Sequence, residues 1–135
     1  ILNQSVCVYG DPIEVSKVRP GREMMLHAPN LAGRIPFAEK KLEDSKSEQE
    51  IKSACLWIMK NILRVGFEFT MERSKRYTRD LYLCYKGFSE YYPEKEPQMR
   101  EVLIYALNPT SDKEKIREIS NAFIPWLIQE SNKYL

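Results

Sequence analysis

Apolar residues recur at intervals of three and four along most of the chain after residue 47. This spacing places apolar side chains on one face of a helix. Ser47 and Glu50 match a capping box, in which the serine hydroxyl accepts from the N–H of Glu50 and the glutamate carboxylate accepts from the N–H of Ser47. The pattern predicts a long helix from about 48 to 73, with these residues on its apolar face: Ile51, Ala54, Cys55, Ile58, Met59, Ile62, Leu63, Phe67 and Met71.

Three further helices are predicted after this one. Four helices with short joints favour an antiparallel bundle, so the predicted fold class is all-α, an antiparallel four- to five-helix bundle over residues 47–135. Their boundary signals are caps and prolines. The predicted helices are Arg79 to about Tyr91, capped by Thr78 and ended by Pro93; Pro97 to Leu107, ended by Asn108-Pro109; and a last helix to about Lys133, opened by a capping box at 111–114 and bent, but not ended, at Pro125.

Residues 1–46 show a different pattern and are predicted to form an N-terminal arm of strand, turn and short helices. Residues 4–9 alternate as a strand does. This strand pairs either with residues 13–18 or, as we prefer, with a sheet in a part of the protein upstream of Ile1. The remaining predictions for the arm are a turn at 10–12, a short helix that Pro20 begins, 23–26 continue and Pro29 ends, an irregular crossing at 27–37, a short turn at 37–42 and a linker at 43–46.

Composition narrows the class of protein. Lysine and arginine number 21 and aspartate and glutamate 19, a net charge of +2, so attraction to nucleic acid or anionic lipid would need a local patch. Three cysteines at unrelated spacings argue against a disulfide framework and a zinc site and favour a reducing cytoplasm. No apolar run approaches the roughly 20 residues that span a bilayer, so we expect a soluble protein without a membrane partner.

A self-sufficient active site is not visible in the sequence. The single histidine, His27, has no partner at i+4, and the chain has neither a glycine-rich phosphate loop nor an Asp-x-Asp pair. Two-metal phosphoryl chemistry therefore cannot be built from this chain alone, and we predict that it holds no metal and no cofactor. The sequence does not identify catalytic residues.

The most distinctive stretch is Phe67–Tyr85, which concentrates cationic and aromatic side chains between two apolar runs. A polar stripe at every fourth position of the long helix leads into this stretch and consists of Lys60, Arg64, Glu68 and Glu72. One interpretation is a solvated face with weak ion pairs. The other is an anion-binding edge, in which Arg79 and the first N–H groups of the next helix face a phosphate or carboxylate, and Tyr77 and Tyr82 supply stacking or hydroxyl contacts.

Three blocks of this region resemble a known family. The blocks RVGFE (64–68), ERxxRYTRDLY (72–82) and YYPEKEPQMR (91–100) are similar to the helical C-terminal half of bacterial proteins of the polymerase-β-like nucleotidyltransferase superfamily. The resemblance implies an accessory, substrate-facing helical domain of an enzyme that transfers a nucleotidyl group from a nucleoside triphosphate to an acceptor. It also implies an upstream nucleotidyltransferase domain in the same chain, which would hold Mg²⁺ and the triphosphate.

The same blocks are similar to the HEPN group of helical domains, which leaves an alternative open. In that alternative the chain is a binding or dimerisation module without catalytic activity, and its candidate partners are RNA and a second copy of the chain in a homodimer. Under either resemblance a small molecule or nucleotide is the expected ligand. The residues that the matched blocks nominate for substrate or anion binding are Glu68, Glu72, Arg73, Arg76, Tyr77, Arg79, Asp80 and Tyr82.

Overall fold

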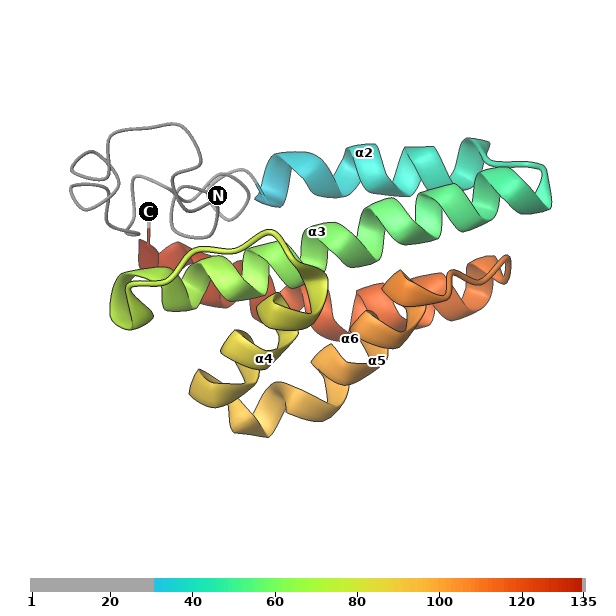
Figure 1. Ribbon diagram of the computed structural model, residues 1–135. Coiled ribbons are helices and arrows are strands. Elements are labelled where there is room, and N and C mark those ends of the chain that lie inside the picture. The colour runs from blue at the N-terminus through green and yellow to red at the C-terminus, as the bar shows by residue number, and fades with distance from the viewer. Residues whose placement is uncertain (1–30, 135) are drawn as a thin grey trace, which may run out of the picture.

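The computed structural model describes residues 31–134, and helices account for nearly all of them (Figure 1). No strand occurs in this range, which confirms an all-α helical bundle. The strand predicted at 4–9, the turn at 10–12, the short helix at 23–26 and His27 lie outside the described residues. The elements are α2 (Leu31–Asp44), α3 (Glu48–Ser74), α4 (Leu81–Tyr91), the 3₁₀ helix η3 (Pro93–Lys95), α5 (Glu96–Leu107), α6 (Lys113–Ser131) and the 3₁₀ helix η4 (Asn132–Tyr134).

Helix α3 is the central element, and α2, α4, α5 and α6 all pack against it. Its predicted capping box is present: the N–H of Glu50 donates to Ser47 Oγ at 3.1 Å, and the N–H of Ser47 donates to Glu50 Oε1 at 3.4 Å. Every residue from Val65 to Met71 is buried, including Glu68 at 5% exposure. Residues 65–71 of α3 are therefore enclosed on all sides, unlike the one-sided amphipathic helix that the sequence pattern predicted.

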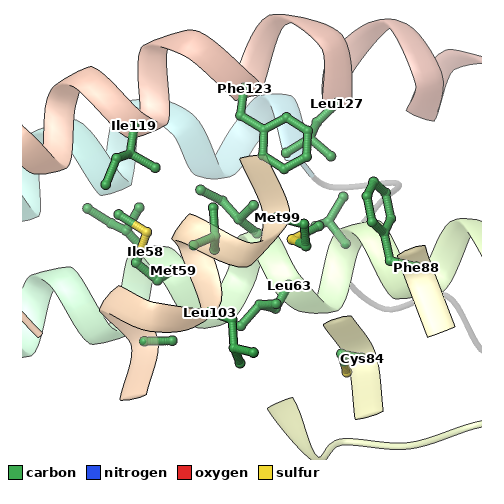
Figure 2. Close-up of a cluster of buried hydrophobic side chains, with 14 of the residues drawn as sticks. Ile58, Met59, Leu63, Cys84, Phe88, Met99, Leu103, Ile119, Phe123 and Leu127 are labelled. Carbon is green, nitrogen blue, oxygen red and sulfur yellow. The ribbon is translucent and has the colours of Figure 1, made fainter. Parts of the chain in front are cut away.

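Side chains from all five described α-helices meet in one core, part of which Figure 2 shows. Ile119, Phe123 and Leu127 extend from α6 toward Met99 of α5 and toward the apolar side of α3, while Phe88 closes the core from α4. Phe88 and Phe123 meet edge to face, with their ring centroids 6.1 Å apart. Burial of these large apolar groups is the main favourable contribution to folding.

The structure contradicts the prediction for residues 31–46. An irregular crossing followed by a short turn was expected, but residues 31–44 form the 14-residue helix α2, with Pro36 inside it. Ile35, Ala38 and Leu42 recur at helical spacing and pack against the core, Leu42 being 3% exposed. This packing outweighs the helix-breaking tendency of Pro36. The predicted linker is correspondingly shorter, since α2 includes Glu43 and Asp44, and the domain boundary at residue 46 stays a prediction.

Several helix ends differ from the prediction by one or two residues, because a different side chain caps the helix. Asp80, not Thr78, caps α4, which begins at Leu81 rather than Arg79. Asp112, not Ser111, caps α6 by accepting hydrogen bonds from the N–H groups of Glu114 and Lys115. Carboxylate caps carry a full negative charge, which the helix N-terminus also favours. The third helix begins at Glu96, one residue before the predicted Pro97, and η3 precedes it.

The directions of neighbouring helices are only partly antiparallel. In Figure 1, α2 and α3 form an antiparallel pair, and α4 and α5 form a second hairpin beside the middle of α3. This second hairpin carries the chain back, so α6 lies beside α3 and runs in the same direction as α3. Helix α6 continues through Pro125 to Ser131, as predicted. None of the described helices is long and apolar enough to cross a bilayer.

Candidate functional site

The predicted basic stretch forms the joint between α3 and α4. Lys75 ends α3 in the left-handed conformation (φ 59°, ψ 32°), and its N–H donates to the carbonyl of Met71 at 2.9 Å. This conformation is costly for a residue with a Cβ, and it reverses the chain direction. Residues 75–80 consequently run back beside the last turns of α3 before α4 begins (Figure 1).

Local hydrogen bonds hold the joint in place. Thr78 is buried, and its Oγ1 accepts from the N–H of Asp80 at 3.0 Å. Asp80 Oδ1 accepts from the N–H of Leu83 at 3.0 Å and thereby caps α4. The thiol of Cys84 donates to the Thr78 carbonyl at 3.8 Å, and burial raises the pKa of this thiol to about 12. Cys84 therefore stays protonated and has a structural role, because the thiolate is the nucleophilic form.

A groove of about 470 Å³ lies between this joint and α4. Three cationic side chains line it: Lys75 and Arg76 from the joint, and Lys86 from α4. The remaining lining residues are mostly apolar or aromatic, apart from one carboxylate: Phe67, Tyr77, Thr78, Leu83, Gly87 and Glu90. The charged residues among those that line the groove sum to a net positive charge of +2, three cations against Glu90.

Close contact between α3 and α4 forms the inner wall of the groove. A Cβ placed on Gly87 would lie 2.7 Å from Cε1 of Phe67 and 2.9 Å from its Cδ1. Only glycine permits this approach, so the α4 backbone lies directly against the Phe67 ring. The groove thus combines an apolar surface with cations at its edge.

A smaller cleft adjoins the groove at the joint. Tyr77, Thr78 and Phe67 line both the groove and this cleft, and Arg64, Glu68, Met71 and Arg79 complete the cleft. The two hollows therefore have different charged side chains. Arg76 lines the groove, whereas Glu68 and Arg79 line the cleft.

Of the remaining predicted site residues, those with described side chains line neither the groove nor the cleft. Asp80 is the cap of α4, and Tyr82 is 54% exposed, with its ring centroid 6.0 Å from that of Tyr85. Glu72 belongs to α3, but its side chain lies outside what the structure describes. The structure therefore brings together four of the eight nominated residues around the joint: Glu68, Arg76, Tyr77 and Arg79.

Arg73 takes part in a separate hydrogen-bonded network. Its guanidinium donates to the hydroxyl of Tyr92 at 2.9 Å and lies over the Tyr91 ring, 4.7 Å from the centroid. The Tyr92 hydroxyl donates in turn to Glu130 Oε2 at 2.7 Å, and Glu130 also pairs with Lys133. Burial would raise the pKa of Glu130, but the hydrogen bonds from Lys133 and Tyr92 and the nearby positive charges lower it overall. This network links the ends of α3, α4 and α6.

The nominated set omits Lys75, Lys86 and Arg64. Lys75 is part of the basic cluster in the sequence, and Arg64 is part of the polar stripe. Lys86 is farther along the chain, and the signal that could have found it is its neighbour Gly87, a helical glycine that indicates close approach of another element. The joint brings Lys86 to the same groove as Arg76, ten residues earlier in the sequence.

A comparison of the chain with models of known families, with curated proteins and with solved structures finds no match in any of the three. The resemblance to nucleotidyltransferases therefore rests on the three sequence blocks alone. Two of these blocks, at 64–68 and 72–82, contribute residues to both the groove and the cleft.

Proposed function

We propose that this chain is an accessory, substrate-facing helical domain of a nucleotidyltransferase, and that the groove beside the α3–α4 joint binds an anionic ligand such as a nucleotide. The observation that carries the proposal is the convergence of Lys75, Arg76 and Lys86 on one groove. These residues come from two elements, and the fold gathers their charges at one place. Ammonium and guanidinium groups are the usual protein partners of phosphate.

The lining of the groove suits a ligand with both an anionic and an apolar part. The cations can neutralise phosphate oxygens, while Phe67, Tyr77 and Leu83 offer apolar and aromatic surface to a base or an acceptor ring. Glu90 is the one carboxylate among the described residues that line the groove. Binding would therefore depend on the lysine and arginine side chains, whereas the upstream domain would supply the Asp-x-Asp carboxylates, Mg²⁺ and the nucleotidyl transfer itself.

A binding experiment tests the groove. The chain is titrated with ATP in calorimetry, and the titration is repeated with Lys86→Gln and with a control, Lys40→Gln, which changes an exposed lysine of α2. Loss of one charge-assisted hydrogen bond should weaken binding by roughly 10- to 100-fold in Lys86→Gln and leave Lys40→Gln unchanged. Equal affinities for both variants, or no binding to the unmodified chain, would contradict the proposed groove.

The coding sequence upstream of Ile1 tests the proposed enzyme class. A Gly-Ser turn followed by Asp-x-Asp in that region supports the nucleotidyltransferase assignment. An upstream region without these motifs would contradict this assignment and leave the groove as the binding site of a different kind of protein.

A further inference from the structure

Two arginines line the small cleft next to the groove. Arg64 projects from the middle of α3, and Arg79 lies immediately before the N-cap of α4. Both line the cleft together with Glu68, Tyr77 and Thr78. The cleft has a volume of about 10 Å³, so it has room for no more than a water molecule and a larger ligand would sit at its mouth.

Arg64 is held in an unfavourable environment. Its Nε is buried, and no described residue accepts a hydrogen bond from it. Burying a guanidinium donor without an acceptor costs free energy. Burial lowers the pKa of Arg64, and the neighbouring positive charge of Arg79 lowers it further. Both arginines line the same cleft, and their like charges repel each other.

The described carboxylates do not balance this repulsion by direct pairing. Among the ion pairs that join two described side chains, none within 4.0 Å involves Arg64 or Arg79. Glu68 lines the same cleft, but its charge is the weakest of the influences on the pKa of Arg64. Two arginines and one glutamate leave one net positive charge in the cleft. A guanidinium pair is well suited to a tetrahedral oxyanion, because each fork can donate two parallel N–H bonds.

We propose that the mouth of the Arg64–Arg79 cleft is a second anion site, which binds one phosphate group, separate from the groove that Lys75, Arg76 and Lys86 line. The phosphate would lie between the two guanidinium groups and relieve their repulsion. The bound phosphate group is either inorganic phosphate or one phosphate of a nucleotide. The site rests on Arg64 and Arg79 alone and does not require that the groove bind a ligand.

Nuclear magnetic resonance provides a direct test, because the Nε–H of Arg64 is a reporter within the site. Inorganic phosphate is titrated into the ¹⁵N-labelled chain, and ATP is titrated in a parallel sample. We expect a saturable shift of the Arg64 Nε–H signal with phosphate, with ATP or with both, and the effective anion identifies the source of the phosphate group. In Arg79→Gln the dissociation constant should rise by about tenfold or more, since one charge-assisted contact is lost.

Two further variants separate this site from the groove and from general charge effects. Arg117→Gln removes an exposed arginine that pairs with Glu114 on α6, and it should leave the Arg64 response unchanged. Arg76→Gln changes the groove and should also leave it unchanged. The proposal is overturned if neither anion shifts the Arg64 signal saturably, if Arg79→Gln binds as tightly as the unmodified chain, or if Arg76→Gln weakens the response as much as Arg79→Gln does. Backbone spectra of each variant verify that the fold is retained.

Discussion

Removing the Tyr92 hydroxyl should measurably destabilise the bundle. Tyr92 is 7% exposed, and its hydroxyl both accepts from Arg73 at 2.9 Å and donates to Glu130 at 2.7 Å. Tyr92→Phe keeps the ring, which stacks on Phe88 with a centroid separation of 4.9 Å, and removes only the polar atom. Hydrogen bonds to charged groups contribute about 1.5–3 kcal/mol, so we expect the free energy of unfolding to fall by about that amount at pH 7.

The pH dependence of this loss gives a second check. The pKa of folded Glu130 is below its ordinary value of 4.5, so the carboxylate stabilises the fold above that value. This stabilisation disappears as the pH falls through the lowered pKa. Because the Tyr92 hydroxyl donates to the ionised form, the difference between Tyr92→Phe and the unmodified chain should shrink below pH 4.5.

Urea unfolding followed by circular dichroism measures both effects, with Tyr82→Phe as the matched control. The Tyr82 side chain is exposed, so its substitution should change stability by less than about 0.5 kcal/mol. The slope of unfolding free energy against urea should stay constant across the variants, since the exposed surface does not change. The reasoning would be refuted by unchanged stability of Tyr92→Phe at pH 7, or by a loss that stays the same size at a pH low enough to protonate Glu130.

Three further outcomes can be measured on single variants. Lys75→Gly should raise the free energy of unfolding in urea by about 1 kcal/mol, because glycine adopts the left-handed conformation without the cost that lysine incurs; equal or lower stability would contradict this. Gly87→Ala should lower stability by about 1 kcal/mol in the same assay, since overpacking against Phe67 exceeds the gain in helix propensity; a more stable variant would argue against the close contact. The carboxyl group of Glu96 should titrate at about pH 2 in ¹³C spectra, because hydrogen bonds from Arg100 and then from Tyr85 lower its pKa. Tyr85→Phe should raise that pKa toward 4.5, and an unchanged titration would show that the phenol contributes nothing.

The helices after residue 47 could be predicted because their signals are local. The Ser47–Glu50 capping box and the three-four spacing of apolar residues depend only on neighbours in the sequence, and both are present in α3. Errors at helix ends arose where two capping residues were close together, as at Thr78 and Asp80. There the choice depends on which side chain reaches the free N–H groups, which the sequence pattern does not specify.

Local signals could predict neither helix α2 nor the burial of residues 65–71 of α3. Pro36 is a local signal against a helix, yet packing of Ile35, Ala38 and Leu42 against the core stabilises α2. Glu68 has the spacing of a solvated stripe residue, yet the elements around α3 leave it 5% exposed. In both cases contacts between segments distant in sequence outweighed the local preference.

The sequence by itself determined the fold class, the long central helix and the stretch that carries the candidate site, because each depends on residue type and short-range spacing. The tertiary structure decided how the charges of that stretch are distributed. The reversal at Lys75 brings Arg76 to the same groove as Lys86, directs Arg79 to a cleft with Arg64, and leaves Arg73 in the network of Tyr92 and Glu130. Side chains only a few residues apart thus face different surroundings, since the direction of the chain at a joint depends on the helices that pack around it.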